Sequence, residues 1–387
     1  MTEQTTRDPL LAWRSRFPTL GNSVHMISHS LGAMPAKAAE DLAEFGWLWT
    51  QRSITAWEEW LPEVERHAGR IGRIVGAPDG SMMMFTNVSS IQATLASCLE
   101  YGNGRDKVVY SELNFPSVSY VWKAEERRGA RVVVVPSDDG IHVDTARFCA
   151  ALDERTLVVP ISHVLFRSSG IKDVRAIVQR AHEVGAIVIL DCYQSAGTVP
   201  FSVEDLGVDF ACGGSVKWLC GGPGAAWLYV NPAIRDRFAP RVTGWFGHKH
   251  PFAFAMPAQD YAENAWRYAG GTHAVAAVYQ ARAGAEIIAE IGVDRIREKS
   301  LRLTGKILAR CEASGYSINS PREPEKRGGT VCFDFPGAAE VARELNRRRF
   351  FCDHRPACGI RMSPHFYSTD GECDDFLDEV ERIRAAL

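Results

Sequence analysis

The chain has 387 residues, of which 46% are hydrophobic and 24% are charged, and its formal net charge is −3 at pH 7. This length and composition are typical of a globular protein with two or three structural units. The small negative charge gives no overall basic field, so we expect neither nucleic acid nor an anionic membrane as a partner. We find no apolar run of the ~18 residues that a membrane span needs and no signal-peptide pattern. The ten cysteines form no CxxC spacing, so we expect reduced thiols, no metal site and a cytoplasmic location.

Residues 1–60 are expected to form an N-terminal segment that packs on the C-terminal part of the chain and on the functional site. From residue 61 to 275, apolar runs typical of buried parallel strands alternate with amphipathic stretches such as Val174–Glu183. This alternation predicts a large α/β domain with a mostly parallel sheet. The predicted strands are Met82–Phe85, Lys107–Tyr110, Arg131–Val135, Leu157–Ile161, Ala186–Leu190, Asp209–Cys212 and Ala226–Val230.

The last part of the chain, residues 276–387, is expected to form a smaller α/β domain. A connector rich in Pro, Phe and Trp precedes it, and a helical stretch without proline extends from Ala274 to about Ser314. A predicted strand (Thr330–Phe335), a helix (Ala338–Arg347) and a final helix (Asp374–Leu387) follow.

Open α/β sheets bind ligands beyond the carboxyl ends of their strands, and polar groups follow predicted strands at three places. The first is Thr86-Asn87-Val88, where the N–H groups of a starting helix would suit a phosphate. The alternative is an ordinary N-cap. The second is Asp191, which needs a partner at the end of a buried strand. A protonated pyridine nitrogen, as in pyridoxal 5′-phosphate (PLP), would supply that partner. A capping or metal-binding aspartate is the alternative.

The third place is Lys217, which lies in the apolar, small-residue stretch Gly213–Trp218. Desolvation lowers the pKa of a lysine and favours the neutral amine that forms a Schiff base. An exposed loop lysine is the alternative.

With these segments in this order, the chain resembles the kynureninase and cysteine desulfurase group of PLP enzymes, the class V aminotransferases of fold type I. The resemblance extends from about Phe17 to the C-terminus. Ser28–Pro35 is similar to the GNSLGxxP motif of kynureninases, and Asp191–Gly197 is similar to the D-x-x-[HQ]-S-x-G of the group. The other matching segments are Asn114–Pro116, Ser215–Gly224, Gly244–His248, Gly271-Thr272 and Arg361–Tyr367.

The resemblance implies a large domain with a mostly parallel seven-stranded sheet, PLP as the cofactor and a homodimer with shared active sites. Lys217 would hold PLP as a Schiff base and shuttle protons, and Asp191 would pair with the pyridine nitrogen. Gln194 would hydrogen-bond the phenolic oxygen, and Phe115 would stack on the ring. The residues implied to hold the phosphate are Thr86, Asn87, Val88 and Ser215.

For the substrate, a small α-amino acid, the resemblance implies that Arg361 grips the α-carboxylate, with Ser30 and His29 close by. Trp245 and Thr272 would reach the cofactor of the neighbouring subunit.

The chain also departs from kynureninases. Val216 replaces the tyrosine that usually precedes the lysine, and Gln194 replaces the usual histidine. His29 replaces the asparagine of GNSLG, and His273 lies where a proline is usual. We therefore predict a different substrate or an altered reaction. His29 and His273 are candidate catalytic residues, and two structural histidines are the alternative.

The predicted function is a PLP-dependent lyase that cleaves a C–S or C–C bond at Cβ of the amino acid. The alternatives are an aminotransferase, epimerase or decarboxylase of the same group, and an inactive PLP-binding protein. Cys192 and Cys220 are predicted to pack in the core, which argues against a persulfide mechanism.

Overall fold

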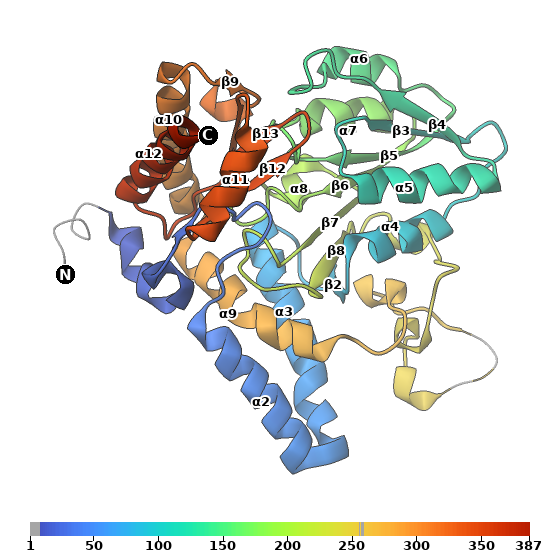
Figure 1. The fold of residues 1–387 in the computed structure, drawn as a ribbon. Coiled ribbons are helices and arrows are strands. Elements are labelled where there is room, and N and C mark those ends of the chain that lie inside the picture. The colour runs from blue at the N-terminus through green and yellow to red at the C-terminus, as the bar shows by residue number, and fades with distance from the viewer. Residues whose placement is uncertain (1–7, 255, 257–258) are drawn as a thin grey trace.

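The computed structural model describes residues 8–254, 256 and 259–387. Its centre is a seven-stranded sheet in the order β2-β8-β7-β6-β5-β3-β4 (Figure 1). The strands are β2 (Met82–Phe85), β3 (Lys107–Ser111), β4 (Arg131–Val135), β5 (Thr156–Ser162), β6 (Ile187–Asp191), β7 (Phe210–Gly214) and β8 (Ala226–Val230). β8 runs antiparallel to both of its neighbours, and the pairs from β7 to β4 are parallel. The predicted fold class, a mostly parallel seven-stranded α/β sheet, is confirmed.

The central strands are apolar because helices cover both faces of the sheet. β6 illustrates this arrangement: Val188 and Leu190 enter the core on one face, and Ile187 and Ile189 enter the core on the other. Side chains from α3, α6, α7 and α9 pack on the first face, and side chains from α4 and α5 pack on the second. The helices are α2 (Ala36–Arg52), α3 (Trp57–Val75), α4 (Val88–Ser97), α5 (Pro116–Ala124), α6 (Thr145–Ala150), α7 (Val174–Glu183), α8 (Val203–Leu206), α9 (Val275–Ile291), α10 (Val293–Ala313), α11 (Ala338–Arg347) and α12 (Asp370–Ala386).

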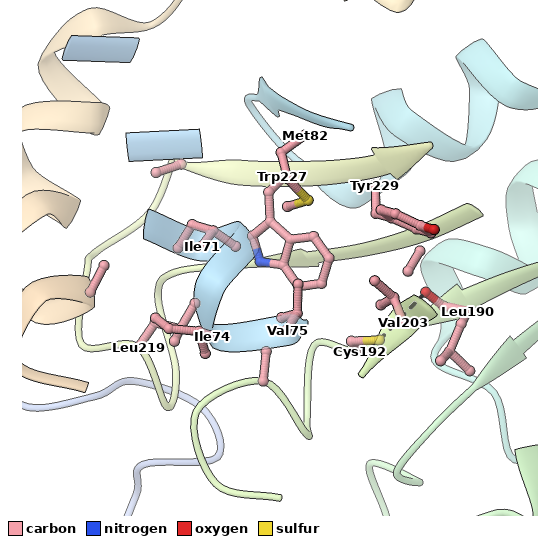
Figure 2. Close-up of a cluster of buried hydrophobic side chains, with 14 of the residues drawn as sticks. Ile71, Ile74, Val75, Met82, Leu190, Cys192, Val203, Leu219, Trp227 and Tyr229 are labelled. Carbon is pink, nitrogen blue, oxygen red and sulfur yellow. Dashed lines mark hydrogen bonds between the residues drawn. The ribbon is translucent and has the colours of Figure 1, made fainter. Parts of the chain in front are cut away.

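Figure 2 shows the centre of the first core, where the ring of Trp227 on β8 lies between the sheet and α3. Trp227 is fully buried, and Ile71 and Val75 of α3 are buried in the same core. The α3 helix ends at Gly76, whose φ of +65° is the left-handed conformation that glycine adopts at helix ends.

The helical stretch predicted from Ala274 to Ser314 is two helices, because Gly292 adopts φ +85° between α9 and α10. Helix α9 packs against α2 and α3 and shares the core of the large sheet, whereas most buried side chains of α10 belong to another core. The domain boundaries at residues 60/61 and 275/276 stay predictions.

That other core lies under a four-stranded antiparallel sheet in the order β12-β13-β10-β9. The strands are β9 (Ser317–Ile318), β10 (Val331–Asp334), β12 (Asp353–Arg355) and β13 (Gly359–Met362). Helices α10, α11 and α12 supply most of the remaining side chains of this core, and Met26 of the N-terminal segment also belongs to it. Helix α12 begins earlier than predicted, because Thr369 and Glu372 form a capping box.

The N-terminal segment contacts both parts of the molecule. β1 (Val24–His25) pairs with β11 (Phe350–Phe351), and Arg14 forms a salt bridge with Glu372 of α12. Farther along, Gly32 N donates to the carbonyl oxygen of Val216 at 2.9 Å. The segment thus lies on the loop that carries Lys217. In the part of the chain that the structure describes, no helix is long and apolar enough to cross a membrane.

Candidate active site

The register of the sheet brings several polar side chains to one edge. Ser162 ends β5 and pairs with Asp191, the last residue of β6, and Asp191 pairs with Cys212 of β7. β7 ends at Gly214, and the chain then forms a tight loop that carries Lys217. Gly221 N donates to Ser215 O across the base of this loop at 2.7 Å. Parallel strands therefore place the acid and the lysine at the same edge.

A cavity of about 270 Å³ opens at this edge. Its walls come from α4, α5, the ends of β5 and β6, and the Lys217 loop. The lining residues are Asn87, Val88, Ser89, Phe115, Ser117, Ser162, Val164, Phe166, Asp191, Tyr193, Gln194 and Lys217. None of these described residues is a cysteine.

The amine of Lys217 lies between two aromatic rings. Its Nζ is 4.4 Å from the ring centroid of Tyr193 and 5.5 Å from that of Phe115. Desolvation lowers the pKa of Lys217 to about 8, although the carboxylate of Asp191 acts in the opposite direction. A neutral, nucleophilic amine is therefore accessible near physiological pH.

Asp191 is buried, and burial raises the pKa of its carboxyl group. The backbone N–H of Tyr193 donates to Asp191 Oδ1 at 2.9 Å. Lys217 lowers the pKa of Asp191 through space, with no hydrogen bond between the two side chains. In the described structure, neither charged group is neutralised by a salt bridge. The cavity thus holds an acid and an amine that are both free to take another partner.

The amide of Gln194 is held at both ends. Trp218 Nε1 donates to Gln194 Oε1 at 3.0 Å, and Gln194 Nε2 donates to the carbonyl oxygen of His29 at 3.0 Å. An amide nitrogen carries two hydrogens, so one donor of Nε2 remains for a group in the cavity.

Helix α4 begins at the cavity with its N–H groups at that end. Asn87 is its N-cap, and Asn87 Oδ1 accepts a hydrogen bond from Ser90 N at 2.8 Å. The cap satisfies that one N–H, so the earlier N–H groups, including those of Val88 and Ser89, remain for an anion.

Arg361 on β13 does not itself line the cavity but contacts its wall, where Nη1 donates to the carbonyl oxygen of Phe166 at 2.8 Å. The other side of its guanidinium faces Asp353, which accepts from Nε at 2.8 Å and from Nη2 at 2.5 Å. The His29 ring is buried beside this pair and does not line the cavity. Its Nε2 is 2.9 Å from Asp353 Oδ1, and its Nδ1 is 2.6 Å from Ser363 Oγ.

Three further predicted residues lie elsewhere. Thr86, Thr272 and His273 line a second cavity of about 220 Å³. His273 packs against Phe246 and Trp266, with ring centroids 4.9 Å and 4.7 Å away. Within one chain, none of these three residues lines the cavity that holds Lys217.

Three more predicted residues also lie outside the lining of the Lys217 cavity. Trp245 is exposed on the connector. Ser30 and Ser215 do not line the cavity either. The Oγ of Ser215 is buried with no hydrogen-bond partner among the described residues.

Known proteins are similar to this chain in sequence and in fold. The aminotransferase class-V family model matches residues 55–361. The kynureninase of Pseudomonas fluorescens is 30% identical over 366 residues, which cover 90% of this chain and 86% of that protein. The chain belongs to the aminotransferase class-V family. A relative from Bacillus subtilis (strain 168), named the uncharacterized aminotransferase YcbU, is 29% identical over 368 residues, which cover 95% of this chain and 96% of that protein.

Two solved structures show the same class-V fold. The apo cysteine desulfurase of Thermococcus onnurineus NA1 has a TM-score of 0.86 at 20% identity and covers 97% of this chain and 98% of its own. The cystine C–S lyase C-DES, in complex with cysteine persulfide, has a TM-score of 0.85 at 18% identity and covers 94% of this chain and 98% of its own. The resemblance to this group is confirmed, and the protein is a PLP-dependent class-V enzyme.

The residues at the cavity fit PLP. The cofactor has an aldehyde for Lys217, a ring nitrogen for Asp191 and a flat ring for Phe115. The unpartnered Ser215 Oγ and the start of α4 offer donors for its phosphate. The acid and the amine are unpaired in the described structure, which is what a cofactor bound between them requires.

Sequence reasoning missed Ser162, Phe166 and Asp353. Ser162 could have been found, because it ends a predicted strand at the same edge as Asp191. No sequence signal points to Phe166. Asp353 lies opposite Arg361 only because two short strands pair in that register.

Proposed function

We propose that this class-V enzyme is a lyase that cleaves a C–S or C–C bond at Cβ of a small α-amino acid. The observation that carries the proposal is the unpaired Lys217 amine, held between two aromatic rings in the cavity that also holds Asp191. A buried acid and a lysine with a pKa of about 8 are suited to PLP chemistry rather than to structural support.

When bound, PLP supplies an electron sink that stabilises negative charge at the substrate Cα. Lys217 Nζ would hold the cofactor covalently and, once free, would move a proton at Cα. The Asp191 carboxylate would keep the ring nitrogen protonated. Phe115 would cover one ring face, and the remaining donor of Gln194 Nε2 would bind the phenolic oxygen. The phosphate would lie against Asn87, Val88 and Ser215, with Thr86 beside them.

The substrate α-carboxylate would bind to Arg361, the buried guanidinium at the cavity wall. A charge-assisted bidentate pair of this kind orients the Cα–H bond as well as providing affinity. We assign no proton-transfer step to His29, because both of its ring nitrogens already have partners.

Two features favour cleavage at Cβ without a persulfide on the enzyme. Cys192 and Cys220 are buried, and burial raises the pKa of Cys220 to about 12. Such thiols are poor nucleophiles. Val216 has no acid–base group, so a leaving group that needs little protonation, such as a thiol or a sulfinate, fits this site best.

We propose a homodimer as the active form. Trp245 and Thr272 are exposed and do not line the Lys217 cavity of their own chain, which supports a role toward a second copy. Light scattering should give a particle heavier than the single chain of 42.8 kDa. A fully active particle of that single mass would refute the dimer.

The decisive experiment follows products by mass spectrometry after incubation with L-cysteine, L-cystine, L-cysteine sulfinate and L-kynurenine. Release of the Cβ substituent supports the lyase. Formation of a keto acid that retains the substituent would make the protein an aminotransferase, as the name of YcbU suggests for that relative. A Lys217→Ala variant is the control, because it should release nothing while keeping the fold.

A further inference from the structure

A polar cluster beside Arg361 has no task in the function proposed above. Its centre is Asp353 on β12, which lies directly opposite Arg361 on β13 in the antiparallel register. Asp353 also accepts from His29 Nε2 at 2.9 Å, and Arg355 Nη2 lies 3.1 Å from its Oδ2. This carboxylate therefore joins two guanidinium groups and one imidazole.

The hydrogen bonds of Arg361 leave one part of its guanidinium free. Arginine has five N–H donors in a fixed plane. Three of them are used: Nε and one Nη2 hydrogen go to Asp353, and one Nη1 hydrogen goes to Phe166 O. One hydrogen remains on each Nη atom. A substrate carboxylate bound to both Nη atoms would accept these two hydrogens.

His29 anchors Asp353 through a directional chain that ends at Oδ1, the oxygen that also accepts from Arg361 Nε. Thr330 Oγ1 is 2.7 Å from Ser363 Oγ, and Ser363 Oγ is 2.6 Å from His29 Nδ1. Burial and the charge of Arg361 lower the pKa of His29 to about 4, so the ring is neutral at physiological pH. Because Asp353 accepts only, His29 Nε2 carries the hydrogen, and Ser363 donates to Nδ1.

The charges of the cluster favour an incoming anion. Hydrogen bonds from His29 and Arg361 hold the pKa of Asp353 well below its usual range despite its burial, so Asp353 is ionised. Asp353 contributes one negative charge, and Arg355 and Arg361 contribute two positive charges. One positive charge is left for a substrate carboxylate.

From this geometry we infer that Asp353 is a positioning residue, which, with His29 behind it, holds Arg361 so that its two free Nη donors face the substrate carboxylate. The inference rests on the proposed role of Arg361 as the carboxylate ligand. Neither Asp353 nor His29 needs to touch the substrate. Substitution of Asp353 or His29 should therefore weaken the recognition of the carboxylate rather than proton transfer.

The test measures carboxylate preference in the holoenzyme, with L-alanine and L-alaninamide as probes whose binding is followed by cofactor absorbance. The preference is the ratio of the Kd of the amide to the Kd of the acid. Asp353→Asn should lower this ratio roughly 10- to 100-fold, because a misplaced guanidinium no longer matches the carboxylate. An unchanged ratio in Asp353→Asn would overturn the inference.

Two further variants make the test specific to position. His29→Ala should lower the ratio, and His29→Gln, which keeps an N–H donor for Asp353, should restore most of it. The matched control is Asp209→Asn, because Asp209 is also a buried aspartate bonded to a histidine, His182, but lies at the opposite edge of the sheet. This control should keep the wild-type ratio even if it loses stability.

The outcome for Arg361→Ala separates the inference from the proposed function. If this variant loses the preference and Asp353→Asn keeps it, Arg361 binds the carboxylate but Asp353 does not position it. If Arg361→Ala itself keeps the preference, the proposed role of Arg361 is wrong, and the inference falls with it.

Discussion

At the scale of single residues, the site depends on leaving two charged groups without partners. Lys217 and Asp191 act on each other only through space, and the protein bears the cost of desolvating both. The small and apolar residues around Lys217 indicated this environment, in which desolvation lowers the pKa of a lysine, and an exposed loop lysine was the alternative. It could not predict that Tyr193 lies nearer to Nζ than Phe115 does, since that depends on the turn after β6.

The pKa of Lys217 gives a prediction for the apoenzyme. Because desolvation lowers this pKa from 10.5 to about 8, the neutral fraction of the amine rises up to about pH 8 and levels off above it. The rate at which Lys217 captures added PLP, followed by absorbance, should level off in the same way, whereas the rate for free N-acetyl-lysine should keep rising toward pH 10.5. A rate for Lys217 that also continues to rise toward pH 10.5 would contradict the lowered pKa.

Val216 gives a second prediction at this scale. We expect L-kynurenine to be a poor substrate, with kcat/KM below about 10⁴ M⁻¹s⁻¹. Val216→Tyr should raise that value, because general acid–base help is worth about 10²–10⁴-fold. Val216→Phe is the control, since it adds the ring without the hydroxyl group. Efficient turnover of L-kynurenine by the unmodified enzyme would make the protein a kynureninase.

At the scale of elements, the Lys217 loop is enclosed by backbone from distant parts of the chain. A Cβ on Gly32 would lie 2.2 Å from the carbonyl oxygen of Lys217, and a Cβ on Gly284 would lie 2.2 Å from that of Leu219. Only glycine allows the N-terminal segment and α9 to approach so closely. The loop is thus held from both sides by elements that contribute no side chain to the cavity.

A substitution at Gly32 tests this contact. Gly32→Ala should destabilise the protein by roughly 1–3 kcal/mol and weaken cofactor retention, because backbone would have to move on both sides. Gly46→Ala is the matched control: Gly46 lies within α2 with nothing near its Cβ position, so the same change should stabilise the protein by about 0.5–1 kcal/mol. Thermal unfolding measures the change in stability of each variant. A Gly32→Ala protein as stable as the wild type would show that the contact is not tight.

The elements differed in how well sequence could predict them. The large sheet was predictable strand by strand, because several of its strands are continuous apolar runs, and β2, β4 and β8 have the predicted bounds. In the small sheet only β10 was predicted, since β9 and β12 are only two or three residues long and are defined by their pairing. The break at Gly292 was also missed, because no proline marks it.

At the scale of the whole molecule, the structure has separate cores for the large sheet and for the C-terminal sheet. Resemblance to a family predicted two domains and a site, and the architecture agrees with that fold class. Residue spacing could not show how the small sheet contacts the large domain. One contact at the site is the hydrogen bond from Arg361 of the small sheet to Phe166 O of the large domain.

Separate cores predict that the apoenzyme unfolds in more than one step. The chain has ten tryptophans, and none lies beyond Trp266. Tryptophan fluorescence therefore reports the large domain and the N-terminal segment, whereas far-ultraviolet circular dichroism reports all helices. In a urea titration the two signals should give different midpoints. Coincident curves would show that the two cores unfold as one cooperative unit.

The hydrogen bond between Arg361 and Phe166 has a consequence for how the enzyme responds to its own ligand. An amino acid held by the cofactor, which Asp191 and the start of α4 would bind in the large domain, and by Arg361 through its carboxylate would tie one core to the other. Ligand binding would then act as a removable cross-link, and its free energy would add to the cohesion between the two cores. A saturated enzyme would lose its two separate midpoints and unfold in a single step. The unfolding curve of the whole chain would then show whether the cavity is occupied.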